Sequence, residues 1–569
     1  MALRMFKFCT VLRSLPMRRQ RQCFSGPLSI LAKRKFSSET RSLQSFDEMI
    51  DMRRGQAQRS VLVQVYSGNS YSDLSELCHE FGKVRETFYY TTNEELHFML
   101  VEFESKESAR KMMDSATFGQ QMPAVPCVTP FLWMRANNIK KAGKGTLCPC
   151  PEAVSDSEAK PEEILHQMRS AQSISQQISV LRNLTKMADV GTRLRFLTAR
   201  QLEMSLSGAF PLIKALPFGS SVNGFGKAGC DLDLVLQLGG LEEGQEIKSQ
   251  GSRLVYHGKN NQSCNGRALV QRHMEVIADF IQHMLPGFSK IQRILHARVP
   301  IIKFRHDLTM VECDLSMTNM TALYMSELLY LMGEIDSRVR PLVCFVRKWA
   351  QSNGLTNQTP GRWISNFSLT LLTIFYLQKK MVLPSLGTLI HLAGPNDKRM
   401  TADGINCTFL RDLSNLSISK NEETLAELLT GFFDFYAGFD FASKGLSLVS
   451  GKEMPKPEHC PLYIENPMER YLNVSKNVSP EETVRLQVEL RNSSWLLEQI
   501  QDEEQNGRES QNWGVLKLLL KSDTSGFKVP KPKTFRLVQV KDLFSEQENG
   551  FSQPRPFLRD VNKSKPKRR

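Results

Sequence analysis

The chain has 569 residues, of which 41% are hydrophobic and 23% charged, so it can bury several cores and is not a disordered protein. Its 74 Lys and Arg residues against 59 Asp and Glu residues give a net charge of +15, which points to a polyanionic partner. The longest apolar runs, such as 367–377, are shorter than the roughly 20 residues of a spanning helix, which excludes membrane insertion. The 12 cysteines lack zinc-site spacing, which favours reduced thiols and no structural metal.

Residues 1–38 contain nine basic residues and no acidic residue. This composition is typical of a mitochondrial transit peptide, and residues 2–9 drawn as a helix are amphipathic. The run 34–36, ahead of Ser37 and Ser38, resembles a matrix-processing site. The alternative is a disordered basic arm that touches nucleic acid. The first interpretation predicts that the protein works in the mitochondrial matrix.

Residues 48–136 show strand and helix patterns in the order β-α-β-β-α-β, the ferredoxin-like plan of RNA-recognition modules. Two of the positions where such modules carry base-stacking rings hold Gln64 and Leu100, although Phe98 is kept. Stacking contributes ~1–3 kcal/mol per base. We therefore expect this domain to bind protein or to dimerise rather than to bind RNA independently.

The composition marks further segments along the chain. Residues 137–160 are polar and rich in Lys, Gly, Pro and Ser, which is typical of a linker. A helical segment is predicted over 161–200, and a second helical region over 321–525. Residues 526–569 are predicted to be a disordered basic tail.

The stretch LPFGSSVNGFGKAGCDLDLVL, residues 216–236, places Asp231 and Asp233 at the start of an apolar strand. Residues i and i+2 of a strand face the same side, so both carboxylates point to one site while the leucines beside them enter the core. Such rigid oxygen ligands suit Mg²⁺, which prefers one or two carboxylates plus substrate phosphates. The glycines and Ser220 allow backbone N–H groups and a hydroxyl to approach phosphate, although the Walker pattern is absent.

The Gly-Ser pair, ten intervening residues and the Asp-x-Asp pair resemble the signature of the DNA polymerase β-like nucleotidyltransferases. That family needs a third carboxylate on a neighbouring strand. The run MVECDLSM offers Asp314, which we choose over Glu312 on the same face. The resemblance implies a nucleotidyltransferase palm over 201–320 and two-metal catalysis with Mg²⁺ or Mn²⁺. The first two carboxylates would bridge both ions, and Asp314 would complete the ion that activates the RNA 3′-hydroxyl.

The helical region after the palm resembles the noncanonical poly(A) polymerase and terminal uridylyltransferase branch. In RPLVCFVRKWAQSNGL a buried apolar face is predicted, with Gln351 where a second lysine is usual. Phe409 is either the aromatic residue that stacks on the base or a core phenylalanine. The nucleotide contacts that the resemblance implies are Gly219, Ser220, Gly229, Cys230, Asn319, Arg347, Lys348, Ser365, Asn366 and Phe409.

Residues 464–474, IENPMERYLNV, resemble the nucleotide-recognition loop of this branch. Uridylyltransferases carry a histidine before the Asn-Val pair, where this chain has Leu472, which favours ATP over UTP. Asn466 stands where an Asp is usual.

Together with the transit-like start, these features are similar to the mitochondrial members of that branch over residues 45–525. The resemblance implies template-independent addition of adenylates from ATP to the 3′ ends of mitochondrial RNAs, with release of pyrophosphate, by a homodimer formed through the N-terminal domain. The alternatives are a uridylyl- or CCA-adding transferase and a catalytically silent RNA-binding scaffold. The expected fold class is α+β, with a ferredoxin-like domain, a palm with a mixed sheet and a helical central domain.

The net charge is unevenly distributed. Residues 1–38 contribute +9 and residues 561–569 contribute +5, which leaves +1 for residues 39–560. RNA binding by the folded part must therefore depend on local clusters of Lys and Arg near the cleft, with the tail as an auxiliary contact.

Overall fold

The computed structural model describes residues 44–92, 95–116, 129–134, 149–208, 210, 212–238, 266–357, 359, 361–416, 420–505 and 513–520, and the backbone of Thr10–Leu12. All of these residues belong to one unit, residues 1–522. The predicted helix at residues 2–9 and the predicted tail at 526–569 lie outside the described residues. Among the described helices, none combines the length and the apolar character that a bilayer crossing requires.

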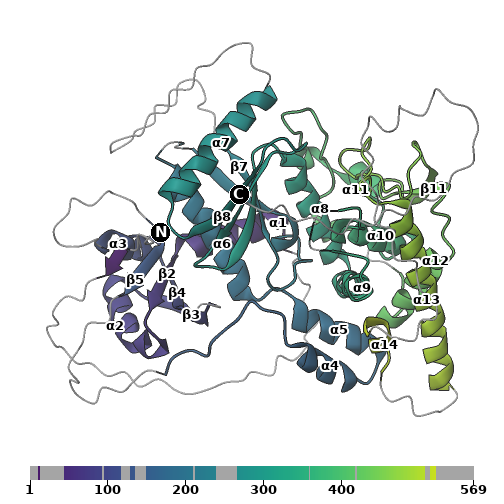
Figure 1. Ribbon diagram of the computed structural model, residues 1–569, viewed down its shortest axis with the longest axis horizontal. Helices are drawn as coiled ribbons and strands as arrows, with labels where there is room; N and C mark the ends of the chain where they lie inside the picture. Colours follow the sequence, from purple (N-terminus) through teal and green to yellow (C-terminus); the bar gives the residue numbers. More distant parts are fainter. Residues whose placement is uncertain are drawn as a thin grey trace, which may run out of the picture. The chain divides into compact units, whose positions relative to one another are not determined.

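The N-terminal elements form a sheet with strand order β1-β5-β2-β4-β3 (Figure 1). Strands β2 to β5 with helices α2 and α3 follow the predicted β-α-β-β-α-β order, and α1 precedes them. The elements are α1 (Phe46–Gln58), β2 (Ser60–Val65), α2 (Tyr71–Phe81), β3 (Val84–Thr91), β4 (His97–Phe103), α3 (Lys106–Ser115) and β5 (Phe131–Met134), with β1 (Thr10–Leu12) parallel to β5.

One face of this sheet packs under α2 and α3, and the other face is covered by α6 (Asp189–Leu206). The covered face includes Leu62, Phe98 and Leu100, each at most 1% exposed, which pack with Leu194 and Leu197 of α6. This is the face on which RNA-recognition modules stack bases. Because α6 occupies it, the domain cannot bind RNA there.

A buried ion-pair cluster joins the two layers at the edge of this contact. Glu102 of β4 is fully buried and accepts hydrogen bonds from Arg59 (2.8 Å) and from Arg193 of α6 (2.5 Å). Burial acts to raise the pKa of Glu102, but the hydrogen bonds from Arg193 and Arg59 outweigh it and leave the pKa lowered.

The second sheet is the mixed palm sheet that the sequence predicts. Its order is β6-β7-β10-β9-β8, with β7 and β10 parallel and the other pairs antiparallel. Its core includes leucines of β7, Phe304 of β9 and Ile277 of α7. The elements are β6 (Lys214–Phe218), β7 (Leu232–Gln237), α7 (Gly266–Met284), β8 (Phe288–Ile294), β9 (Ile301–His306) and β10 (Val311–Ser316).

The remaining described elements are mainly helical and share one hydrophobic core. As predicted, α9 buries Leu342, Phe345, Val346 and Trp349 completely. The helices are α4 (Pro161–Arg169), α5 (Ile174–Thr185), α8 (Met320–Ile335), α9 (Val339–Ser352), α10 (Asn366–Lys379), α11 (Leu386–Leu392), α12 (Leu425–Ala437), α13 (Pro480–Gln505) and α14 (Leu516–Leu519), with the hairpin β11 (Lys444–Ser447) and β12 (Lys452–Pro455). The α+β class is confirmed.

Glu102→Gln is expected to lower the free energy of unfolding by roughly 3 kcal/mol, because Glu102 is the fully buried anion between Arg59 and Arg193, and a neutral amide cannot balance their charge at that point. The melting temperature of the purified chain measures this. Glu104→Gln is the control, since Glu104 forms an exposed pair with Lys83 whose loss costs less than about 1 kcal/mol. Equal melting temperatures for the two variants would contradict the assignment.

Candidate active site

Three adjacent strands place charged side chains in one row across the palm sheet. Asp233 of β7 is the direct cross-strand partner of Asp314 of β10, and Asp314 is the partner of Lys303 of β9. Asp231 directly precedes β7 and is exposed, and the charges of Asp314 and Lys303 both act on it. Glu312 is exposed and lies opposite Arg305. The register therefore makes Asp314, rather than Glu312, the carboxylate beside Asp233.

The close approach of like charges perturbs these carboxylates. Burial, together with the neighbouring carboxylates of Asp314 and Asp231, raises the pKa of Asp233 to about 7. Burial and Asp314 also raise the pKa of Asp231. A site that assembles anionic groups in this way is stabilised by a cation.

Lys303 supplies positive charge at one end of the row. Its Nζ lies 2.8 Å from Oδ1 and 2.5 Å from Oδ2 of Asp314. Among the described residues, no group of three or more His, Cys, Asp or Glu side chains lies close enough together to hold a metal ion. Lys303 thus occupies both carboxylate oxygen atoms of Asp314 in this structure.

Gly219 allows the glycine loop, residues 219–229, to approach the carboxylates. Its φ is +72°, and a Cβ atom there would lie 2.2 Å from Oδ2 of Asp233. Its backbone N–H donates to the hydroxyl of Ser326 on α8 (2.7 Å). Only glycine combines this backbone conformation with this contact.

Two arginines hold the glycine loop by its carbonyl groups. Arg182 of α5 donates to the carbonyls of Gly224 (2.7 Å) and Gly226 (3.2 Å), and Arg347 of α9 donates to that of Phe225 (2.8 Å). Arg182 was not among the predicted site residues, because it lies on a helix distant in sequence and nothing in the sequence signals this contact.

Arg347, which the resemblance places at the triphosphate, is engaged by protein groups. Besides the Phe225 carbonyl, it donates to the Asn366 carbonyl (3.2 Å) and the Thr370 hydroxyl (2.9 Å). Burial lowers the pKa of Arg347 to about 10, so it stays charged at neutral pH. In this structure Arg347 joins the glycine loop to α10.

The start of α10 brings Ser365 and Asn366 to the surface. Ser365 is the N-cap, and its hydroxyl accepts the N–H of Ser368 (3.0 Å). The next residue, Phe367, is half-buried in the first turn. Phe367 was not among the predicted nucleotide contacts. Its one sequence signal is that it is an aromatic residue directly after two of those contacts, Ser365 and Asn366.

Phe409, one of the predicted nucleotide contacts, lies in the core. Its side chain is 1% exposed, and the guanidinium of Arg411 lies over its ring at 4.5 Å. Arg411 is itself held by an ion pair with the buried Glu327 (2.7 Å). A base cannot reach this ring without disrupting that pair.

The remaining predicted nucleotide contacts lie in or directly after the glycine loop, at the start of α8 and on α9. Ser220 is half-buried in the short 3₁₀ turn Gly219–Ser221, and Gly229 has a φ of +68°. Cys230 is half-buried beside Asp231, and Asn319 occupies the N-cap position of α8. Lys348 lies farther along α9, with its Nζ 3.4 Å from the Glu158 carboxylate.

The predicted recognition loop 464–474 is folded against itself and tied to the palm. The Asn466 side-chain oxygen accepts the N–H groups of Met468 (3.0 Å) and Glu469 (3.1 Å). The Glu469 carboxylate accepts hydrogen bonds from Arg298 (2.7 Å) and from the Thr321 hydroxyl (3.4 Å). Asn466 therefore closes the loop, and Glu469 joins it to the palm.

Three family models match the chain. They are the central palm domain of mitochondrial-like poly(A) RNA polymerase over residues 174–334, the Cid1 family poly A polymerase model over 424–471, and the RL domain over 45–117. The mitochondrial poly(A) RNA polymerase of Drosophila melanogaster is 43% identical over 89% of this chain and 85% of its own length. That of Homo sapiens is 36% identical over 88% and 85%.

The chain belongs to the mitochondrial poly(A) RNA polymerase family. A crystal structure of mtPAP with ATPγS superposes with a TM-score of 0.75 at 35% identity, covering 84% of this chain and 100% of that chain. An mtPAP structure with UTP gives a TM-score of 0.74 over the same shares. The predicted family, the poly(A) polymerase function and the mitochondrial location are confirmed, and they prevail over the uridylyltransferase and scaffold alternatives.

Without divalent cations, the stability of this polymerase is expected to fall as the pH rises from about 4 to about 7. Over that interval the folded chain keeps Asp233 protonated, because its pKa is about 7, whereas the unfolded chain ionises it near pH 4. The native state binds more protons there, so the free energy of unfolding decreases with pH. Melting temperatures in EDTA across this pH range measure the effect.

Asp233→Asn should flatten this pH dependence, and the exposed control Glu312→Gln should leave it unchanged. A slope that is the same in all three proteins would contradict the assignment.

Proposed function

We propose that Asp231, Asp233 and Asp314 bind two divalent cations, Mg²⁺ or Mn²⁺, and that the triphosphate of ATP binds between them and the glycine loop. The direct pairing of Asp233 with Asp314 carries this proposal, because half-buried carboxylates that share a site need positive charge. Their hard oxygen atoms fit these ions. When bound, such ions neutralise the triphosphate and favour deprotonation of the attacking hydroxyl.

The chemical step takes place between the two substrates, and the chain's own groups hold them in position. The RNA 3′-oxygen attacks the α-phosphorus of ATP, the bond from that phosphorus to the bridging oxygen of the β-phosphate breaks, and pyrophosphate leaves. The reaction needs no protein nucleophile. In this proposal, backbone N–H groups of the glycine loop and the Ser220 hydroxyl hold phosphate oxygens; the contacts of Arg182 and Arg347 with loop carbonyls support it.

We assign recognition of the base to the start of α10 and the loop 464–474. Phe367 replaces Phe409 as the stacking aromatic, since it is half-buried beside the exposed Ser365 and Asn366. Leu472 offers no hydrogen bond to uracil, which supports ATP as the preferred substrate. The mtPAP structures contain ATPγS in one case and UTP in another, so extension assays rather than binding must test this choice.

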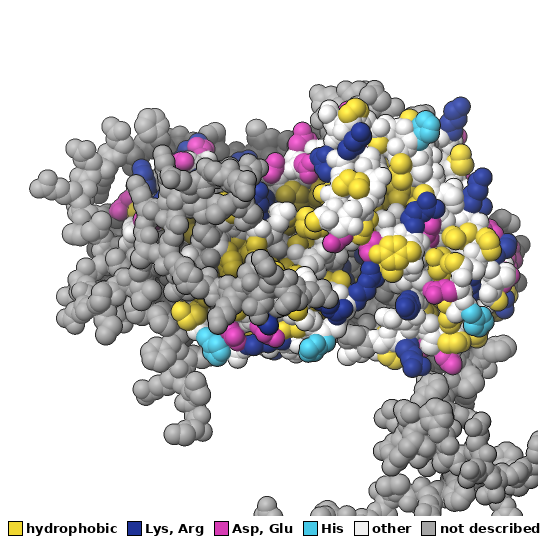
Figure 2. Space-filling view, turned by 90° about the horizontal axis from the view of Figure 1, so that it is seen from above, with side chains coloured by type: hydrophobic (Ala, Val, Ile, Leu, Met, Phe, Trp, Pro, Cys, Tyr) yellow, Lys and Arg dark blue, Asp and Glu magenta, His cyan; other side chains and the backbone are white. Residues whose placement is uncertain are grey.

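The proposal extends to partners and processing. Residues 1–38 act as a transit peptide, and residues 48–136 pair two copies of the chain. Because α6 covers one face of that domain, a second copy would use its edges or the outer surface of α2 and α3. Residues 39–560 carry a net charge of only +1, so RNA is held by local groups of Lys and Arg rather than by one uniform field. On the face in Figure 2, Lys and Arg side chains are scattered among acidic and apolar ones.

Asp231→Asn, Asp233→Asn and Asp314→Asn should each slow adenylate addition by about a thousandfold or more, because each removes charge on which phosphoryl transfer depends. The assay uses the chain from Ser37 onward, a 3′-hydroxyl RNA and each of the four nucleoside triphosphates separately. Wild type is expected to extend with ATP. Glu312→Gln is the matched control on the same strand and should retain activity. Extension by UTP alone would overturn the proposal.

Phe367→Ala should raise the KM for ATP about five- to a hundredfold with little change in kcat, the loss expected from ~1–3 kcal/mol of stacking. Steady-state kinetics at saturating RNA measure this. Phe409→Leu, which keeps an apolar side chain in the core, should leave the KM for ATP unchanged. An increase in KM for Phe409→Leu alone would reverse the two roles.

A further inference from the structure

Part of the predicted linker forms a strap, residues 153–156, that runs from the N-terminal domain to the catalytic loop. Ala153 forms a parallel bridge with Tyr89 on β3, and the N–H of Val154 donates to the Tyr89 carbonyl (2.8 Å). Val154 also packs against the apolar cluster between the N-terminal sheet and α6. The strap is therefore fixed to the edge of the N-terminal domain.

Asp156, at the end of the strap, forms a closely fitted contact with α6. Its Oδ2 lies 2.7 Å from Nη1 of Arg195, and its Oδ1 accepts the N–H of Ala188 (3.2 Å). A Cβ atom at Gly191 would lie 2.2 Å from Cγ of Asp156, so only glycine leaves room for this carboxylate. Arg195 is 2% exposed. The pair is thus a buried and sterically defined feature.

Arg195 connects this pair to the active site. Its Nε donates to the carbonyl of Cys230 (3.2 Å), and its Nη2 donates to the same oxygen. That carbonyl belongs to the peptide unit that joins Cys230 to Asp231. Because a peptide unit is planar, fixing its oxygen also fixes the Cα atom of Asp231. Two donors from one rigid guanidinium define this orientation more strictly than a single donor does.

We propose that Asp156 and Arg195 are positioning residues that orient Asp231 for catalysis and make this orientation depend on the docked N-terminal domain. The inference rests on the proposed role of Asp231 as a metal ligand. The order of contacts is Tyr89, strap, Arg195, Cys230 carbonyl and Asp231. Neither Asp156 nor Arg195 needs to touch substrate.

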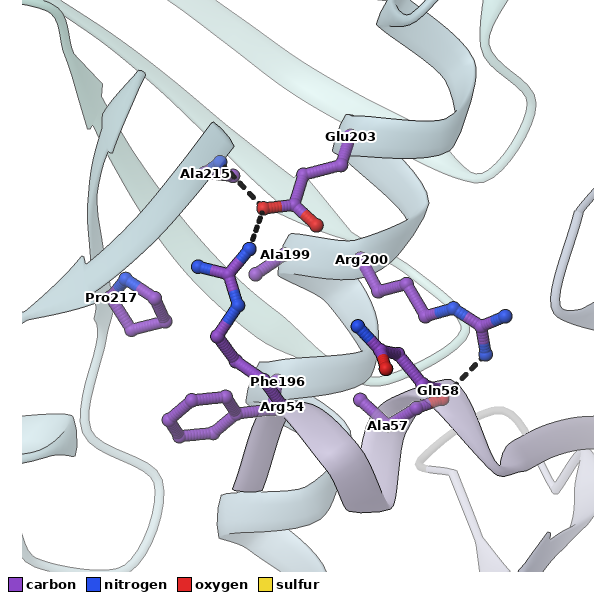
Figure 3. A pocket seen from close by; sticks show the side chains of 9 residues that line it. All are labelled: Arg54, Ala57, Gln58, Phe196, Ala199, Arg200, Glu203, Ala215 and Pro217. Atoms are coloured by element: carbon purple, nitrogen blue, oxygen red, sulfur yellow. Dashed lines mark hydrogen bonds and ion pairs between the residues drawn. The ribbon is translucent and has the colours of Figure 1, made fainter. Parts of the chain in front are cut away.

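The test compares Arg195→Lys with Arg200→Lys in the full chain. Lysine at 195 keeps the charge beside Asp156 but cannot donate twice to the Cys230 carbonyl. Arg200 is a half-buried arginine on the same helix, and its guanidinium donates to the carbonyls of Ala57, near the end of α1, and of Ser60 on β2 (Figure 3). These acceptors lie outside the glycine loop. Both variants should lose similar thermal stability.

Arg195→Lys should lower kcat about ten- to a hundredfold while the KM for ATP stays within about twofold, the pattern of a misplaced catalytic group. Its affinity for Mn²⁺, measured without nucleotide by electron paramagnetic resonance, should also fall. Arg200→Lys should keep both kcat and Mn²⁺ affinity. Gly191→Ala, which displaces Asp156, should reproduce the effects of Arg195→Lys.

Unchanged kcat and Mn²⁺ affinity in Arg195→Lys, or equal losses in both lysine variants, would overturn the inference. Asp231→Asn separates this failure from that of the proposed function. If Asp231→Asn is inactive while Arg195→Lys is fully active, only the positioning role fails. If Asp231→Asn keeps activity, the proposed function itself fails.

Discussion

The repulsion between Asp233 and Asp314 is the constraint on which the rest of the site depends. Parallel pairing of β7 with β10 places the two carboxylates directly opposite each other, and burial raises the pKa of Asp233 to about 7. Carboxylates held this close are unfavourable in a fold that lacks a compensating cation. The structure compensates in part with Lys303, which contacts both oxygen atoms of Asp314. In the proposed function, metal ions and substrate bind at this arrangement of carboxylates and Lys303.

The scaffold around the carboxylates works by fixing backbone oxygen atoms. Arg182 and Arg347 donate to carbonyls of the glycine loop, and Arg195 donates to the carbonyl of Cys230 directly after it, from three different helices. Guanidinium groups suit this role because they stay charged and present several donors in one plane. The loop glycines then provide close approach without themselves determining where the loop lies. Because the arginines determine where the loop lies, a glycine-rich segment can take part in a site whose atoms are precisely positioned.

The N-terminal domain shows how a familiar plan is used for a different purpose. Its sheet follows the order of an RNA-recognition module, yet α6 covers the face on which bases would stack, and Glu102 with two arginines joins the layers. Leu100 at a stacking position, together with Leu62 and Phe98 on the same face, packs against Leu194 and Leu197 of that helix. The missing rings and the buried face therefore have the same physical cause.

The sequence by itself determined the elements and their chemistry. Alternation and helical spacing predicted the α+β fold, the apolar face of α9 and the strands that carry the three aspartates, because these patterns reflect local geometry. It did not show that Asp314 is the direct cross-strand partner of Asp233 or that Phe409 lies in the core. It also did not show that Arg347 is engaged by backbone groups or that the predicted linker reaches Arg195. Each of these depends on strand register or on contacts between residues far apart in sequence. Only the tertiary structure fixes such contacts, since a residue's type does not show which distant group packs against it.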